Sequence, residues 1–316
     1  MSDVKKIATR ESYGKTLVEL GREDKDLVVM DADLAGATKT GMFRKEFPER
    51  FFNAGIAEAD MVSIAAGLAA CGKKPFISSF AMFATGRAYE QIRNSIAYPR
   101  LNVKICASHA GISVGEDGAS HQCVEDISLM RSIPGMVVVN PADDIEAKAA
   151  IRALYEYEGP AYCRLGRAAV PVINEGNADY KFELGKGITI KDGNDVTLIA
   201  TGLCVSSAID AAELLEKDGI STRIINIHTI KPLDNDIIVK AAKETKTLIT
   251  VEEHSVIGGL GSAVCDCLAE YYPCRLKKIG IQDVFGHSGS CDALIKEYQL
   301  DGQGIYEQVK AYLKTL

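Results

Sequence analysis

Tryptophan is absent from this sequence of 316 residues, and so is any apolar run long enough to cross a membrane. The first ten residues lack the apolar core of a signal peptide, so we expect none. Acidic residues outnumber basic ones by 43 to 36, and the net charge of −7 excludes a general binder of nucleic acids or anionic membranes. The nine cysteines are odd in number and lack the spacing of a disulfide framework or zinc ribbon. We therefore expect reduced thiols and a cytoplasmic protein.

Hydrophobic residues make up 47% of the chain, which is enough for two cores. Apolar strand-like runs alternate with helical stretches, which predicts α/β layers on mainly parallel sheets. The predicted strands are 27–32, 74–79, 102–108, 136–141, 161–165, 195–200, 221–226, 246–251 and 275–281. The predicted helices lie near 11–22, 58–70, 81–97, 122–132, 143–157, 203–217, 234–243, 259–271 and 303–314. A polar, glycine-rich linker near 175–185 predicts two consecutive α/β domains, 1–178 and 179–316.

One loop concentrates polar side chains that could carry chemistry. The stretch SHAGISVGEDGASHQ (108–122) follows a predicted strand, where ligands of open α/β sheets bind. It holds His109, Glu116, Asp117 and His121, and its glycines permit turns that aim several side chains at one point. Two other readings stay open, namely a solvated loop with an Asp-Gly turn and a zinc site on both histidines and a carboxylate.

A carboxylate at the start of an apolar helix raises a second question. Glu58 opens the stretch EADMVSIAAGLAA. It is either a first-turn residue stabilised by the helix dipole or a carboxyl group kept protonated by apolar surroundings. Nearby, Phe80 and Phe83 are three residues apart, a helical spacing that is typical of cores and also compatible with a ring-binding face.

Two weaker patterns lie further along the chain. Arg164 and Arg167 stand at the end of a predicted strand, where they could grip an anionic substrate. The glycines of VIGGLGSA (256–263) fit a crowded strand-to-helix turn better than a dinucleotide fingerprint, because Val264 stands where the third glycine would be.

Taken together and in order, five segments resemble the C-terminal half of transketolase. They are NAGIAEADMVSIAAGLA, SFAMFATGRAYEQIRN, SHAGISVGEDGASHQCVEDISLMRSIPGMVVVNPAD, HTIKPLD and VEEHSVIGGLGSAV. The resemblance covers about residues 5 to 314, and its most specific part is the G-E-D-G-x-x-H-Q block with an upstream histidine. Pyruvate dehydrogenase β subunits and deoxyxylulose-phosphate synthases share the layout but fit this loop less well.

The resemblance implies thiamine diphosphate as cofactor, bound through a pyrimidine-binding domain followed by a transketolase C-terminal domain. Glu58 occupies the place of the glutamate that donates a hydrogen bond to the aminopyrimidine ring. It thereby favours the imino form, which removes the thiazolium proton. Phe80 and Phe83 match the pyrimidine pocket, and Asp33 matches a cofactor-site aspartate. Gly86 stands where the family often has a tyrosine.

The resemblance also implies a substrate site for sugar phosphates. His109 and His121 match histidines that bind sugar oxygens and move protons. Asp117 matches an aspartate that recognises a sugar hydroxyl. Arg10 and Arg167 match arginines that bind the substrate phosphate. Arg164 fits this register poorly. A phosphate-binding serine of the family falls near Ala37, where the neighbouring Thr38 is a substitute.

The sequence contains no Gly-Asp-Gly. The family uses that motif, with an asparagine about thirty residues on, to hold Mg²⁺ and the diphosphate, and Mg²⁺ needs such oxygen ligands. We therefore predict the C-terminal subunit of a split transketolase of the pentose phosphate type. A separate N-terminal subunit would hold Mg²⁺, in an α2β2 heterotetramer with contact between β chains. The alternatives are the β subunit of a 2-oxo acid dehydrogenase E1 component and a non-catalytic partner of the same fold.

Overall fold

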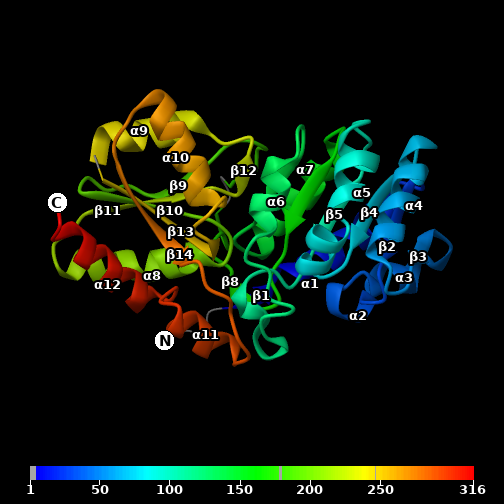
Figure 1. The fold of residues 1–316 in the computed structure, drawn as a ribbon, viewed down its shortest axis with the longest axis horizontal. Coiled ribbons are helices and arrows are strands. Elements are labelled where there is room, and N and C mark those ends of the chain that lie inside the picture. The colour runs from blue at the N-terminus through cyan, green and yellow to red at the C-terminus, as the bar shows by residue number, and fades with distance from the viewer. Residues whose placement is uncertain (1–4, 178–179, 246) are drawn as a thin grey trace.

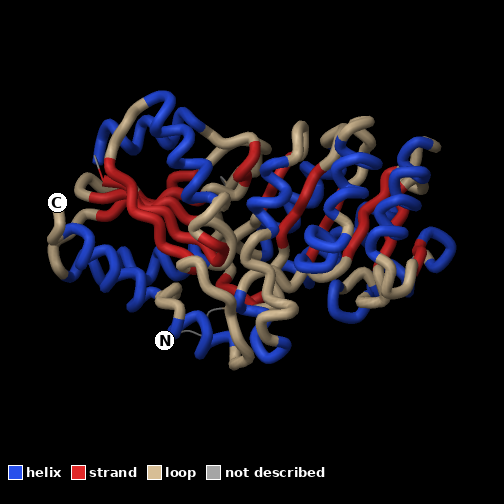
Figure 2. The backbone as a smooth tube through the Cα atoms, in the orientation of Figure 1, coloured by secondary structure: helices blue, strands red, loops and turns tan. Residues whose placement is uncertain are grey.

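The computed structural model describes residues 5–177, 180–245 and 247–316, and these residues form two α/β units side by side (Figure 1). In each unit a central sheet lies between helices (Figure 2). This confirms the predicted fold class. The predicted boundary between residues 178 and 179 lies outside the described residues, as does the first residue of the strand predicted at 246–251.

The first unit is built on a seven-stranded sheet in the order β12-β6-β7-β5-β4-β2-β3. Its strands are β2 (Leu27–Asp31), β3 (Phe51–Asn53), β4 (Lys74–Ser78), β5 (Lys104–Ala107), β6 (Val137–Val139), β7 (Ala161–Arg164) and β12 (Thr229–Lys231). All neighbours are parallel except β12, which pairs antiparallel with β6. Because β12 comes from the second half of the chain, the second unit extends the sheet of the first.

Helices cover both faces of this sheet. They are α1 (Thr9–Glu23), α2 (Ala35–Thr38), α3 (Gly41–Glu46), α4 (Glu58–Ala70), α5 (Tyr89–Gln91), α6 (Asp126–Ser132) and α7 (Asp144–Glu156), with 3₁₀ turns η1 (Pro48–Arg50) and η4 (Ile112–Asp117). The single helix predicted over 81–97 instead consists of π-helical turns η2 (Met82–Arg87) and η3 (Ile92–Ala97) around α5. There the Thr85 hydroxyl donates to the Ala81 carbonyl at 2.7 Å and competes with the backbone ladder.

The second unit is built on a five-stranded sheet in the order β14-β13-β10-β11-β9, parallel except for β9. Its strands are β9 (Ile188–Lys191), β10 (Val196–Ala200), β11 (Thr222–Asn226), β13 (Thr247–Ser255) and β14 (Arg275–Ile281). Its helices are α8 (Cys204–Lys217), α9 (Asn235–Thr245), α10 (Leu260–Tyr271), α11 (Cys291–Glu297) and α12 (Gly302–Leu313). A short antiparallel pair, β1 (Lys6–Ala8) with β8 (Ala169–Pro171), closes the first unit.

The strands that the sequence predicts are confirmed, because buried parallel strands read as continuous apolar runs. Every residue of β2, β10 and β11 is buried. Within the described residues, none of the helices combines the length and the apolar character that crossing a bilayer requires.

Candidate active site

The side chains that the sequence singles out follow five neighbouring strands of the first sheet. In the order β7, β5, β4, β2, β3, the residues that follow are Arg167, His109, Phe80, Asp33 and Glu58. The five strands are parallel, so their carboxyl ends share one edge of the sheet (Figure 1). The fold therefore brings five separate segments of the chain to one edge.

Two phenylalanines and two histidines form a cluster at this edge. The rings of Phe80 and His109 stack with centroids 3.9 Å apart, and those of Phe80 and Phe83 stack at 6.0 Å. His121 meets the Phe83 ring edge-on at 5.1 Å. Phe80 and His109 are buried, whereas Phe83 and His121 are only partly buried, and Phe83 borders a cavity of about 330 Å³. A ligand can therefore reach the second pair.

His109 is held neutral and in one tautomer. Arg10 Nη1 lies 3.4 Å from His109 Nε2, and because a guanidinium can only donate, Nε2 accepts. The ring proton is then on Nδ1, which donates to Ser108 Oγ at 2.9 Å. Burial, followed by the charges of Arg10 and Arg167, lowers the pKa of His109 to about 3. Both ring nitrogens are engaged, which disfavours a zinc ligand, and the described residues hold no cluster of three metal-ligating side chains.

We expect the His109 ring to remain neutral from pH 8 down to 5 in an NMR titration of the imidazole protons. Because its folded pKa lies below the ordinary value, the unfolded chain binds a proton that the folded chain does not. This group therefore lowers stability as the pH falls from about 6.5 toward 3. Arg10→Met should raise the His109 pKa. The exposed His287 is an internal control, because its hydrogen bond with Glu297 raises its pKa. A wild-type His109 that titrates near 6.5 would contradict this assignment.

Two arginines bring positive charge to the same edge. Arg10 Nη1 also donates to the Ala37 carbonyl at 2.7 Å, and its buried Nε has no partner among the described residues. Arg167 forms an ion pair with Glu116 at 2.6 Å, and 36% of its side chain is exposed. Asp117 follows Glu116 in η4 and is exposed. The free donors of Arg10 and Arg167 suit an anionic group.

Asp33 lies in the β2–α2 loop, in a left-handed conformation with φ 64°. Asn53, at the end of β3, accepts from its backbone N–H at 3.0 Å and donates to its carboxylate at 3.1 Å. Asp31, a residue that sequence reasoning missed, holds this loop in place. It is buried and accepts hydrogen bonds from the hydroxyls of Thr38 and Thr40 at 2.6 and 2.9 Å. Thr38 is fully buried against Asp31, which contradicts its suggested role as a phosphate ligand.

Glu58 is the first residue of α4, and 4% of it is exposed. Its carboxylate accepts no capping hydrogen bond from a backbone N–H among the described residues. Its partner is Arg87, whose Nη1 lies 3.3 and 3.5 Å from the two carboxylate oxygens. The guanidinium of Arg87 also lies over the Phe83 ring, 4.1 Å from its centroid. The apolar surroundings expected for Glu58 therefore contain one cation, which sequence reasoning missed.

Arg164 is a buried structural residue, so the suggestion that it grips an anion is wrong. Its Nε donates to Asp126 in α6 at 2.8 Å, and its Nη2 donates to the backbone oxygen of Glu253 in β13 at 2.8 Å. Tyr162 donates to the same Asp126 at 2.6 Å. Glu253 in turn accepts from the Ser113 N–H at 2.6 Å. The side chain therefore points to the interior, where it ties the loop of His109 to the second unit.

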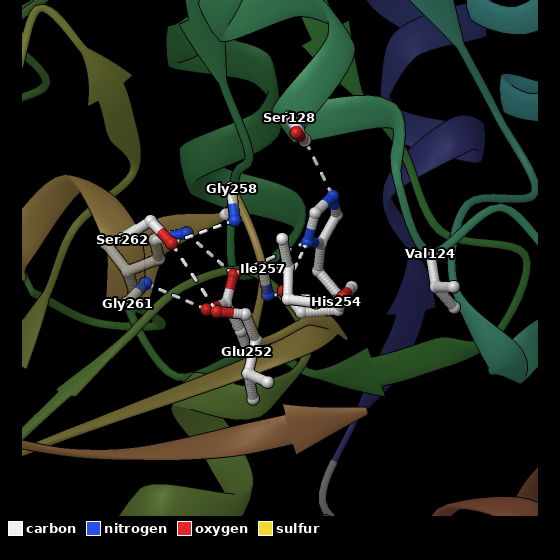
Figure 3. Close-up of polar contacts among 12 residues, drawn as sticks. Val124, Ser128, Glu252, His254, Ile257, Gly258, Gly261 and Ser262 are labelled. Carbon is white, nitrogen blue, oxygen red and sulfur yellow. Dashed lines mark hydrogen bonds and ion pairs between the residues drawn. The ribbon is translucent and has the colours of Figure 1, made fainter. Parts of the chain in front are cut away.

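The glycine-rich turn after β13 is filled by one of the protein's own carboxylates (Figure 3). Glu252 accepts from the backbone N–H groups of Leu260 and Gly261, at the N-terminus of α10, at 2.6 and 2.8 Å. A Cβ atom at Gly258 would lie 2.1 Å from Ser128 Oγ. The turn is crowded as the sequence indicates, and Glu252 occupies the position that a dinucleotide's diphosphate would need.

Residues 5–172 match the family described as transketolase, pyrimidine binding domain, and residues 185–305 match transketolase, C-terminal domain. The chain belongs to the transketolase family. A protein of Methanocaldococcus jannaschii that carries the assignment of a transketolase C-terminal section is 53% identical over 306 residues, 96% of each chain. One of the subunits of an apulose-4-phosphate transketolase, from Phocaeicola vulgatus, is 42% identical over 308 residues, 98% of each chain.

Two further proteins show how much of a relative's length this chain covers. A solved structure of a split gene transketolase, an inactive beta4 tetramer, is 48% identical with a TM-score of 0.89, over 98% of this chain and 99% of that chain. Human transketolase is 35% identical over 310 residues, which are 98% of this chain but 49% of that protein. The chain thus spans about half the length of a whole transketolase.

Proposed function

We propose that this chain is the C-terminal subunit of a two-subunit, thiamine diphosphate-dependent transketolase in the cytoplasm. With its partner it moves a two-carbon ketol unit from a ketose phosphate to an aldose phosphate. The observation that carries the proposal is the cluster of Glu58, Phe83, His109 and His121 at one sheet edge, in a chain that covers half of a transketolase. The domain boundary between residues 178 and 179 is part of the same proposal.

The residues at the sheet edge fit the pyrimidine ring of thiamine diphosphate. Glu58 offers a carboxyl group shielded from water for a hydrogen bond to a ring nitrogen, and Phe83 offers a partly exposed aromatic ring, over which Arg87 lies in the free chain. Phe80 supports that face, and Asp33 stands on the loop after the neighbouring strand. When bound, the cofactor supplies the nucleophilic carbon that carries the two-carbon unit.

The remaining residues suit a phosphorylated sugar. The half-buried His121 and the neutral His109 would bind sugar oxygens and pass protons, and the exposed Asp117 would accept from a hydroxyl. Arg10 and Arg167 would hold the phosphate, for which Arg10 keeps a free Nε donor.

Two features support a partner chain that holds Mg²⁺ and the diphosphate. The sequence has no Gly-Asp-Gly, and α4 carries apolar residues on its exposed face as well as its buried one. Ile64 on that face is 42% exposed and Ile56 just before the helix is 78% exposed. We propose that a chain with Gly-Asp-Gly and a downstream asparagine covers this face, in an α2β2 heterotetramer with contact between two copies of this chain.

Reconstitution tests this proposal. The isolated chain should show no turnover of xylulose 5-phosphate with an aldose phosphate acceptor. Addition of the N-terminal subunit, Mg²⁺ and thiamine diphosphate should raise the rate roughly a hundredfold or more, because the site is then complete. Apulose 4-phosphate belongs among the donors, since a 42% identical relative is named for it.

Three outcomes would contradict the proposal. Full activity of the isolated chain would rule out a divided site. Turnover of pyruvate in place of sugar phosphates would indicate the β subunit of a 2-oxo acid dehydrogenase. No turnover of either, with both subunits folded and associated, would indicate a non-catalytic partner.

A further inference from the structure

Arg87 makes two contacts that place it directly at the candidate cofactor site. Its Nη1 spans the two carboxylate oxygens of Glu58 at 3.3 and 3.5 Å, and its guanidinium lies 4.1 Å from the centroid of the Phe83 ring. These are an ion pair and a cation–π contact made by one planar group. Its side chain is 54% exposed, so the guanidinium is bound on one side only.

In the free chain, Glu58 depends on Arg87 for its counter-charge. Among the described residues, Arg87 is the one side chain that pairs with Glu58, which is 4% exposed. A buried carboxylate without a counter-charge is costly, so the free chain gains from holding the arginine there. Gly86 has no side chain that could shield Phe83, and a Cβ atom at Gly86 would lie 2.4 Å from Met82 Cε. Arg87 is therefore the residue of η2 that covers the ring.

Arg87 occupies the two surfaces that the proposed function assigns to the pyrimidine ring. A planar heterocycle cannot stack on Phe83 and bond Glu58 while the guanidinium lies over both. We propose that Arg87 is a placeholder for the cofactor's pyrimidine ring: it holds Glu58 and Phe83 in the binding arrangement in the free chain and leaves when the ring enters. This inference rests on the proposed function and adds a residue that sets cofactor affinity.

A placeholder makes cofactor binding weaker than it would otherwise be. The site is competent only in the fraction of molecules whose arginine has moved out, and the apparent Kd rises by the inverse of that fraction. A half-exposed ion pair and one cation–π contact together correspond to about a threefold to tenfold effect. Because the guanidinium is half exposed, it can move into solvent without unpacking the core.

The test is the Kd of thiamine diphosphate at saturating Mg²⁺, measured by calorimetry on the assembly with the N-terminal subunit. Arg87→Ala should bind the cofactor about threefold to tenfold more tightly than the wild type, and Arg87→Lys should fall between the two. Arg93→Ala is the matched control, because Arg93 is exposed on η3 and donates to its neighbour Asn94. Its Kd should be unchanged.

A second measurement needs no cofactor. In the isolated chain the effects of Arg87→Ala and Glu58→Gln on the urea midpoint should be non-additive, since the two side chains contact each other. Arg87→Lys replaces Arg87→Ala in the cycle if the latter folds poorly.

The outcomes separate this inference from the proposed function. If the assembly binds the cofactor in a Glu58-dependent way but Arg87→Ala leaves the Kd unchanged or weakens binding, Arg87 is not a placeholder and the proposed function stands. Additive effects in the isolated chain would also overturn the inference. If the wild-type assembly does not bind the cofactor, or Glu58→Gln does not alter binding, the proposed function fails and this inference fails with it.

Discussion

Glu58→Gln should lower the turnover of the reconstituted enzyme by about 10²- to 10⁴-fold, the range for loss of a positioned acid–base group. The carboxyl group can both donate and release a proton at its site, whereas an amide cannot release one. Substrate affinity should change little, because the substitution removes a proton transfer that occurs during the reaction. The loss should therefore appear in kcat. Glu58→Ala should lose at least as much.

The same helix supplies a matched control. Asp60 is the other carboxylate in the first turn of α4, and it is exposed. Asp60→Asn changes the charge at the helix N-terminus by the same amount, so it tests the helix-dipole interpretation of Glu58. It should leave turnover near the wild-type value. Equal losses from Asp60→Asn and Glu58→Gln, or full activity of Glu58→Gln, would show that Glu58 has only a structural role.

Arg164→Met should destabilise the chain by about 3–5 kcal/mol, which is typical of removing one partner of a buried ion pair. The variant leaves Asp126 without its cation and Glu253 without the charge 3.9 Å away. Both the arginine and Asp126 are buried, so water cannot replace the lost contacts. Urea unfolding at pH 7.5 measures the loss.

The pH dependence of this loss gives a second readout. Burial raises the pKa of Glu253, and Arg164 opposes that rise. Without Arg164 the folded pKa of Glu253 should rise further, so stability falls as the pH increases from the unfolded pKa through the folded one. The deficit should therefore be smaller at pH 5 than at pH 8. Arg152→Met is the control, since Arg152 pairs with Glu19 and Glu23 at the surface and should cost at most about 1 kcal/mol.

A pH-independent deficit would contradict the role assigned to Arg164, and so would a loss no larger than that of Arg152→Met. Either result would mean that the contacts of Arg164 with Asp126 and Glu253 do not hold the loop of His109 to the second unit.

Much of the fold could be predicted from the sequence, because long buried strands and amphipathic helices leave periodic patterns. The elements that escaped prediction are short or depend on tertiary contacts. The strand β12 has three residues, lies in the second half of the chain and pairs at the edge of the first sheet. No local pattern indicates such a pairing. The helix α2 has four residues in a loop organised by buried Asp31, which is also a tertiary effect.

The candidate site shows the same division. Phe80 and His109 follow predicted strands of a mainly parallel sheet, so their place at one sheet edge could be expected, whereas the resemblance alone implied that Glu58 joins them. The direction of a single side chain does not follow. Arg164 and Arg167 are three residues apart at the end of one strand, yet the first is buried in an ion pair and the second is partly exposed beside Glu116.

The proposed function depends most on where Glu58 lies when the site is complete. The decisive measurement is a structure of this chain with its N-terminal subunit, Mg²⁺ and thiamine diphosphate. We expect a Glu58 carboxyl oxygen within about 2.7–3.2 Å of a nitrogen of the pyrimidine ring, with the ring over Phe83. A Glu58 side chain in open solvent, or a cofactor bound away from it, would contradict the account.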